Sequence, residues 1–231
     1  RETIETPLDP EDTFEDDPLR MIRAARFATQ LEFRVSDRVF AAMRTQAERV
    51  EILTQERITE ELHKMLEADT PSIGFKMLEA AGVLPHFMPE LQRLKGVDGD
   101  ILGVHKANFY HTLEVLDTLA ERTADRPGEE TRWLRWAALL HDIAKPHTKR
   151  FTPEDGWTFH GHEDKGARMI PDLFRKWRLP TDERMDYVQK LVRLHLRPIA
   201  LADEDVTDSA VRRLLYEAGD AIDDLMTLVR S

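Results

Sequence analysis

The sequence predicts an all-α protein, because apolar residues recur at helical spacing from Pro18 to the end of the chain. Met21, Ile22 and Ala25, for example, recur three and four positions apart, which is the spacing of one buried helix face. A pattern typical of strands is confined to KRFTPEDGWTF at 149–159, where two β-prone ends flank a Pro-Glu-Asp-Gly turn. We therefore expect helices throughout, with at most one short β-hairpin.

The composition limits what the chain can be. Its 231 residues are 41% hydrophobic, enough to bury the core of one large or two small domains. The absence of cysteine excludes disulfides and thiolate metal ligands and suits a reducing compartment, so we expect a cytoplasmic protein. No apolar run is long enough to span a membrane. The net charge of −11 argues against non-specific coating of nucleic acid, so any RNA contact must come from local basic patches.

The N-terminal half is predicted to be a series of helices behind an irregular segment. Residues 1–17 are acidic and carry Pro7 and Pro10, so we expect a linker that enters from a preceding part of a longer protein. Asp17-Pro18 is a helix start signal, with Asp as the cap and Pro in the first turn. The helices expected in this half span 18–30, 36–49, 56–68 and 72–81, the last stopped by Gly82 and Pro85.

A segment rich in glycine and aspartate, 92–104, marks the best internal boundary. We therefore divide the chain into a helical unit at 1–100 and a second helical unit at 101–231. The helices expected in the second unit span 107–124, 129–143, 163–177, 181–195, 207–217 and 219–230.

The first long helix carries a basic stripe. Asp17, Arg20, Arg23 and Arg26 step around one side of it, which is compatible with a solvated face that Asp17 merely caps. The chemistry also allows base recognition. Cytosine and adenine each present an amino donor beside an unprotonated ring nitrogen, which suits a carboxylate acceptor and a guanidinium donor. Guanine and uracil present the opposite pattern, so an Asp/Arg pair one helical turn apart can accept C and A and refuse G and U.

A second constellation surrounds the adjacent pair His141-Asp142, at the end of an apolar helical run. A buried Asp needs a partner, and a divalent cation satisfies a neutral His and an ionised Asp together. The alternative is a hydrogen-bonded pair that caps a core helix. The density of further histidines and a neighbouring basic run favours a metal or phosphate site, whereas His147 and His160 are expected at the surface or behind the ligands.

Three segments of the first half resemble the bacterial tRNA nucleotidyltransferases, the CCA-adding enzymes, and the related poly(A) polymerases. They are FEDDPLRMIRAARFATQLEF, similar to the family's neck, and the segments ERITEELHKML and PHFMPEL. In that family an E-D-x-x-R element templates the incoming CTP or ATP, and Asp17 and Arg20 match its Asp and Arg. Arg23 and Arg26 match arginines that also line the nucleotide site. Asp16 stands where the family often has Glu.

The resemblance also implies what this chain lacks. The family's polymerising head, which binds the Mg²⁺ used for nucleotidyl transfer, would lie upstream of Arg1. We therefore expect that this chain alone does not transfer nucleotides.

The second half resembles the HD-domain phosphohydrolases. The metal ligands that this resemblance implies are His111, His141, Asp142, His162 and His195. Lys145 matches a family lysine and is expected to bind phosphate, although Ala144 replaces the usual glycine. The closing aspartate of the HD pattern would fall past Ser231, so we expect a truncated ligand set. The implied chemistry is hydrolysis of a phosphoester by water activated on a transition metal or Mg²⁺.

The leading hypothesis is therefore the neck, body and HD portion of a CCA-adding enzyme, with CTP, ATP and the 3′ end of tRNA as partners. A poly(A) polymerase of the same family is the nearest alternative, and no residue separates the two. An HD phosphohydrolase whose first half binds RNA, or a non-catalytic RNA-binding module with a vestigial HD fold, are alternatives of other classes. The sequence does not indicate an oligomeric state.

Overall fold

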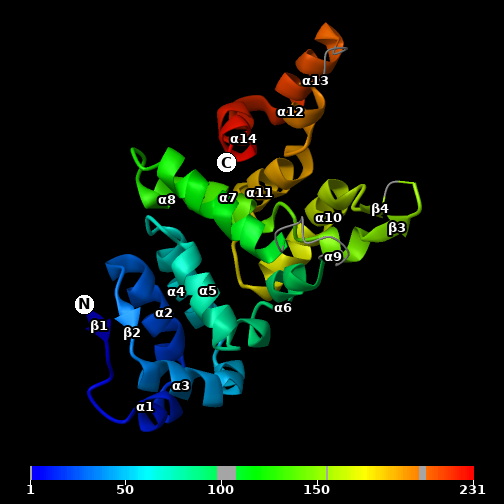
Figure 1. The fold of residues 1–231 in the computed structure, drawn as a ribbon. Helices are drawn as coiled ribbons and strands as arrows, with labels where there is room; N and C mark the ends of the chain where they lie inside the picture. Colours follow the sequence, from blue (N-terminus) through cyan, green and yellow to red (C-terminus); the bar gives the residue numbers. More distant parts are fainter. Residues whose placement is uncertain (1, 98–107, 155, 203–206) are drawn as a thin grey trace.

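The computed structural model describes residues 2–97, 108–154, 156–202 and 207–231, and it confirms the all-α prediction (Figure 1). The first half contains the α-helices α1 (Pro10–Asp16), α2 (Leu19–Leu31), α3 (Asp37–Thr45), α4 (Gln55–Leu66), α5 (Ser72–Ala80) and α6 (Pro89–Gln92), and the 3₁₀ helices η1 (Ala47–Ile52), η2 (Leu84–His86) and η3 (Arg93–Val97). The second half contains α7 (Asn108–Arg122), α8 (Gly128–Leu140), α9 (Lys145–Thr148), α10 (His162–Lys176), α11 (Glu183–Leu194), α12 (Arg197–Ala200), α13 (Asp208–Ala218), η4 (Gly219–Ala221) and α14 (Ile222–Val229).

Two short strand pairs accompany the helices. Strands β3 (Arg150–Thr152) and β4 (Gly156–Thr158) are antiparallel, which confirms the predicted hairpin. Strands β1 (Thr3–Ile4) and β2 (Arg34–Val35) form a parallel pair that was not predicted. A strand of two residues leaves no alternation long enough to detect in a sequence.

The expectation of an irregular linker at residues 1–17 was wrong. Helix α1 occupies Pro10–Asp16; Asp9 caps it by accepting a hydrogen bond from the Glu11 backbone N–H at 2.9 Å, and Pro10 takes its first position. Thr13 and Phe14 are buried with Pro10, at spacings of three and four residues. This helical period is too short to stand out among the acidic residues around it.

One continuous apolar core runs through both halves, from Phe14 to Leu228. Hydrogen bonds also join the halves: Thr59 Oγ1 on α4 donates to the Trp177 carbonyl at 2.6 Å, and Arg135 Nη1 on α8 donates to the Leu66 carbonyl at 2.6 Å. The predicted boundary at 92–104 lies partly outside the described residues. The division into units at 1–100 and 101–231 therefore stays a prediction.

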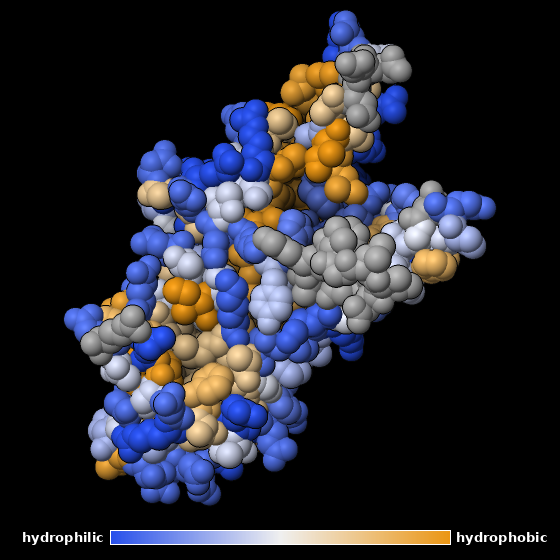
Figure 2. Space-filling model, in the orientation of Figure 1, coloured by the Kyte–Doolittle hydropathy of each residue, from blue (hydrophilic) through white to orange (hydrophobic). Residues whose placement is uncertain are grey.

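The surface is mainly hydrophilic in the view of Figure 2, and apolar residues gather around α12 and α13. There Ile199 and Leu215 leave 55% and 50% of their surface exposed. Within the described part of the chain, no helix has the length and apolar character that crossing a bilayer requires.

The close approach of α2, α4 and α5 gives a test of the packing. A Cβ added at Gly74 would lie 2.3 Å from Met65 Sδ and 2.6 Å from Thr29 Oγ1. Met65 is fully buried, and the Thr29 hydroxyl donates to the Ala25 carbonyl at 2.9 Å, so neither atom can withdraw freely. Gly74→Ala should lower the free energy of unfolding by about 1–2 kcal/mol, because overpacking outweighs the gain in helix propensity.

Denaturant unfolding monitored by circular dichroism measures this change. Gly96→Ala is the matched control, since a Cβ at Gly96 meets nothing within 4 Å and the position is exposed. A Gly74→Ala variant as stable as Gly96→Ala would contradict the packing described for α2, α4 and α5.

Candidate functional site

Five predicted metal ligands come together from four helices and their ends, and we call them the histidine cluster: His111, His141, Asp142, His162 and His195. His111 lies on α7, and His141 and Asp142 directly follow α8. His162 begins α10, and His195 directly follows α11. His141, Asp142, His162 and His195 are buried, whereas His111 is exposed. Residues more than eighty positions apart in the sequence therefore meet around one carboxylate.

Backbone carbonyls orient three of the four imidazoles in the same way. The Nδ1 atoms of His141, His162 and His195 lie 2.7–2.8 Å from the carbonyl oxygens of Ala138, Phe159 and Val192, each three residues earlier. When Nδ1 carries the proton and donates it to the carbonyl, Nε2 keeps its lone pair. This second hydrogen bond is the usual way in which a protein fixes the orientation of a metal-binding histidine.

The Nε2 atoms converge on Asp142. Oδ2 lies 3.2 Å from His141 Nε2, and Oδ1 lies 3.1 Å from His162 Nε2 and 3.9 Å from His195 Nε2. Oδ2 is buried, and although Lys145 Nζ lies 2.6 Å away, no residue in the described part of the chain meets Oδ2 with hydrogen-bond geometry. A histidine–aspartate pair that only capped α8 would not gather two further imidazoles from other helices.

The electrostatics keep Asp142 ionised and favour the neutral forms of His111 and His195. Burial opposes ionisation of Asp142, but His141, His162 and Lys145 hold the pKa of its carboxyl well below the usual value. Burial lowers the pKa of His195 to about 3 and also lowers the pKa of His111. Burial disfavours the charged form of His141 too, but Asp142 raises its pKa above the ordinary value.

This donor set is compatible with a divalent cation. His111, His141 and Asp142 form one group and Asp142, His162 and His195 another, with ligand atoms within 4.8 Å of one another in each group. Neutral imidazole nitrogens and one carboxylate suit Zn²⁺, Fe²⁺ or Mn²⁺. The cluster lines a cavity of about 200 Å³, and Asp142 is the one carboxylate among the described residues that line it.

Lys145 also reaches this cavity. Its Nζ lies 2.6 Å from Asp142 Oδ2 and donates a hydrogen bond to Asn108 Oδ1 at 3.1 Å. The lysine predicted to bind phosphate is therefore beside the cluster and paired with its carboxylate.

The predicted nucleotide-binding residues lie on and before α2, in a different part of the molecule from the histidine cluster (Figure 1). Asp17 separates α1 from α2, and its Oδ1 accepts a hydrogen bond from the Leu19 backbone N–H at 3.2 Å. Arg57 Nη2 also donates to Asp17, with distances of 3.2 and 3.3 Å to its two oxygens. Arg20 Nη1 donates to the Thr13 carbonyl at 3.0 Å. The Asp17 side chain thus has the contact expected of a helix cap, and it is paired with Arg57.

The other two predicted arginines converge on one buried acid, Glu61. Arg23 Nε donates to Glu61 Oε1 at 3.3 Å, Arg26 Nη1 lies 3.2 Å from Oε2, and Lys64 Nζ lies 3.5 Å from Oε1. Only 2% of the surface of Glu61 is exposed, and a carboxylate buried to this extent is strongly destabilising without such cationic partners. We call these four residues the neck cluster.

Sequence reasoning missed Glu61 and Arg57, although both lie in a segment whose family resemblance was recognised. The available signal was the position of Glu61 on the apolar face of α4, where Ile58, Leu62 and Met65 are also buried. A carboxylate on such a face requires cationic partners. The arginine stripe of α2 is the nearest source of these partners.

Comparison with known proteins bears on both sites. The HD domain model matches residues 108–227, and a model described as the probable RNA and SrmB-binding site of polymerase A matches residues 32–95. An A-adding tRNA nucleotidyltransferase of Deinococcus radiodurans is 34% identical over 226 residues, which cover 95% of this chain and 49% of that protein. A multifunctional CCA protein of Ralstonia nicotianae is 37% identical over 184 residues, which cover 75% of this chain and 39% of that protein.

The chain therefore spans half or less of the length of these relatives. The HD domain match alone takes in more than half of the chain, and the RNA-binding match takes in most of the region before it. This chain belongs to the HD-domain family, joined to an RNA-binding region of the polymerase A type, and it is a relative of the bacterial tRNA nucleotidyltransferases over nearly its whole length.

Proposed function

We propose that this chain is the base-selecting and RNA-binding part of an enzyme that adds C and A to the 3′ end of tRNA with CTP and ATP. The observation that supports the proposal is the neck cluster, in which a buried Glu61 pairs with Arg23 and Arg26. Both arginines lie on the helix that follows Asp17 and carries Arg20, in a chain related to tRNA nucleotidyltransferases. Because the chain spans only part of its relatives, nucleotidyl transfer and its Mg²⁺ are assigned to a head domain outside it.

Base selection follows from donors and acceptors. The Asp17 carboxylate accepts from the amino group of cytosine or adenine, and the Arg20 guanidinium donates to the neighbouring ring nitrogen. In the present structure the Asp17 carboxylate accepts a hydrogen bond from Arg57, and the Arg20 guanidinium donates one to the Thr13 carbonyl. An incoming base replaces these contacts with its own donor and acceptor groups, while the neck cluster provides positive charge for the triphosphate.

Two alternatives of the same class differ in the nucleotides used. The relative from Deinococcus radiodurans is named A-adding, which favours an enzyme that uses ATP alone as the second candidate. A poly(A) polymerase would also use ATP, but would continue beyond one residue. Incubating the whole enzyme with tRNA ending in C, CC or no terminal C, and with each nucleotide in turn, separates these three activities.

For the histidine cluster we propose metal-dependent hydrolysis of a phosphoester. A bound divalent cation would supply an activated water and polarise a phosphoryl oxygen. His111, His141, Asp142, His162 and His195 are the residues that would hold it. Lys145, which reaches the same cavity, would hold a phosphate oxygen by exchanging its contact with Asp142. A phosphohydrolase without nucleotidyltransferase activity would not explain the neck cluster, because hydrolysis does not require selection of C and A.

The metal assignment predicts that the purified chain, dialysed against Zn²⁺, Mn²⁺ or Mg²⁺, retains about one equivalent of a divalent ion measured by elemental analysis. Asp142→Asn should lose it, because the carboxylate shared by both ligand groups is removed. Asp164→Asn, an exposed acid on α10, is the control and should retain the metal.

Metal affinity should also fall as the pH is lowered from 8 to 5.5. The pKa of His141 is raised, so its proton competes with the metal at a higher pH than an ordinary imidazole would allow. Equal metal content in wild type and Asp142→Asn, or an affinity that rises toward pH 5.5, would contradict the assignment.

Base choice distinguishes a templating Asp17 from a cap. In the whole enzyme, Asp17→Ala and Arg20→Ala should each relax discrimination against GTP and UTP by about ten- to a hundredfold, since each lost charge-assisted bond is worth roughly 1.5–3 kcal/mol. As a cap, Asp17 would contribute about 1 kcal/mol to stability and nothing to base choice.

Asp17→Asn separates these roles, because asparagine caps a helix about as well as aspartate but presents an amide donor as well as an acceptor. The preference of the Asp17→Asn enzyme is measured by competition between all four nucleotides, as ratios of kcat/KM. An Asp17→Asn enzyme with full preference for CTP and ATP would assign Asp17 to capping alone.

Glu61 is assigned as a positioning residue for the neck arginines. Glu61→Gln removes the charge that orients Arg23 and Arg26, and we expect KM for CTP and ATP to rise about tenfold while kcat falls less. It should also lower stability by about 1–3 kcal/mol. Glu60 is an exposed neighbour on α4, and Glu60→Gln should leave the kinetic constants and the stability unchanged. A stability loss in Glu61→Gln with KM unchanged would restrict Glu61 to a structural role.

A further inference from the structure

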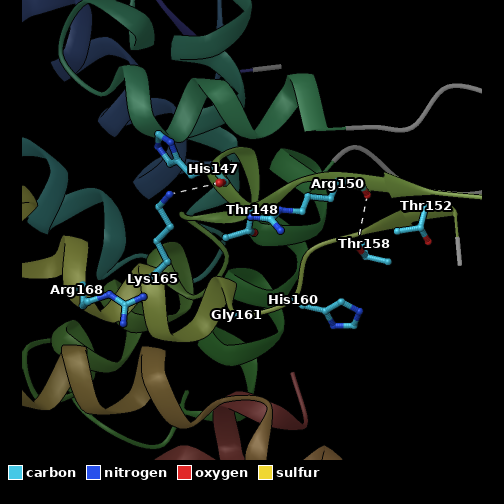
Figure 3. Close-up of a pocket in the computed structure, with 9 residues that line it drawn as sticks. All are labelled: His147, Thr148, Arg150, Thr152, Thr158, His160, Gly161, Lys165 and Arg168. Atoms are coloured by element: carbon cyan, nitrogen blue, oxygen red, sulfur yellow. Dashed lines mark hydrogen bonds between the residues drawn. The ribbon is translucent and has the colours of Figure 1, made fainter.

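A second cavity, of about 500 Å³, lies between the β3–β4 hairpin and the first turns of α10 (Figure 3). We call it the hairpin pocket. None of its lining residues belongs to the histidine cluster, yet the two sites are neighbours. The short helix α9 places Lys145 at the cluster and His147 and Thr148 at the hairpin pocket. Similarly, α10 begins with His162 in the cluster and continues to Lys165 and Arg168 at the pocket.

The hairpin presents two chemically different faces. In its register Arg150 pairs with Thr158 and Phe151 pairs with Trp157, so the basic residue and the threonine share one face and the aromatic pair shares the other. Arg150, Thr152 and Thr158 line the pocket. Phe151 and Trp157 are 55% and 42% exposed, and their rings meet edge to face with centroids 5.3 Å apart.

The pocket is lined by cations without acids. Arg150 comes from β3, and Lys165 and Arg168 come from neighbouring turns of α10. In Figure 3 the Arg150 side chain extends from the hairpin toward α10, whereas the His160 ring points the other way. No carboxylate lines the pocket within the described ranges, and no ion pair is found there for any of these three cations. Among the described residues, Lys165 Nζ donates a hydrogen bond to the His147 carbonyl, at 3.4 Å.

This arrangement stands out against the net charge of the chain, which is −11. At the far end of α10 the cations are paired, since Arg175 pairs with Asp172 and Lys176 with Glu90. Three cations gathered around one cavity repel one another unless an anion lies between them. Guanidinium and ammonium groups beside threonine hydroxyls are the donors that bind phosphate oxygens.

We propose that the hairpin pocket binds phosphodiester groups of RNA, as a contact separate from the RNA-binding match at 32–95. The aromatic face favours a nucleic-acid strand over a small anion. Trp157 is exposed on the opposite face of the same hairpin, with Lys149 Nζ 4.3 Å from its ring centroid. A strand that passes over the hairpin can therefore stack a base on Trp157 while adjoining phosphates lie among the cations. The choice of tRNA as the natural RNA rests on the proposed function.

The test is binding of the whole chain to a tRNA transcript and to a single-stranded RNA, followed by fluorescence anisotropy between 50 and 250 mM salt. The triple variant Arg150→Ala, Lys165→Ala, Arg168→Ala should reduce the slope of log K against log salt by about 2, and affinity at about 100 mM salt by tenfold or more. Trp157→Ala should reduce affinity by about tenfold with the slope unchanged, because it removes stacking without removing charge.

The matched control is Arg193→Ala, Arg212→Ala, Arg213→Ala, which removes the same charge from exposed positions on α11 and α13. It should keep nearly the wild-type slope. Thermal melts of both triple variants check folding, and the three pocket cations are exposed or half-buried, so the melts should match wild type.

The proposal is overturned if tRNA binds wild type and the pocket variant with the same slope, or if the control variant loses as much slope. It is also overturned if the pocket variant loses binding of ATP or inorganic phosphate while RNA binding is unchanged, since the pocket would then be a small-anion site. In each of these outcomes the base-choice test at Asp17 is unaffected. Failure of wild type to bind tRNA at all would overturn both the pocket and the proposed function.

Discussion

Two buried carboxylates, Asp142 and Glu61, depend on positive charge, and this requirement organises both sites of the chain. An ionised carboxylate removed from water is strongly destabilising unless cations or hydrogen-bond donors replace the lost solvent. Glu61 receives Arg23, Arg26 and Lys64, whereas Asp142 receives imidazoles and Lys145. In the first arrangement Arg23 stays exposed at the surface, and the second leaves a cavity whose charge balance is compatible with a metal ion.

The sequence predicted most of the helices because each buries one face with the 3.6-residue period. It also predicted the five residues of the histidine cluster, through a pattern of residue types that resembles a known family. It did not predict the partners that arrive from distant helices. Glu61 meets Arg23 across 38 positions and Arg57 meets Asp17 across 40, and neither contact leaves a local pattern. The hairpin was predicted, but the cavity beneath it depends on how the hairpin packs against α10.

The way in which the imidazoles are oriented explains why such a cluster can form from separate helices. Each of His141, His162 and His195 uses a carbonyl three residues before it, at the end or the start of a helix. The orientation is therefore a local property of each helix terminus and does not require a shell of further polar side chains. Packing of α7, α8, α10 and α11 then only has to bring the termini together, and apolar contacts such as the stacking of Trp136 on Trp177 contribute to this packing.

Helix α10 connects the histidine cluster to the helix that carries Glu61. Its first residue is His162, and directly after its last residue comes Trp177, whose carbonyl accepts from Thr59 on the helix that also carries Glu61. Helix α10 has 15 residues and is therefore about 22 Å long. The length of α10 therefore sets the spacing between His162 at its start and α4, which contacts Trp177 at its end. A one-residue insertion in α10 would rotate one end of the helix against the other by about 100° and so change how the two sites are placed relative to one another.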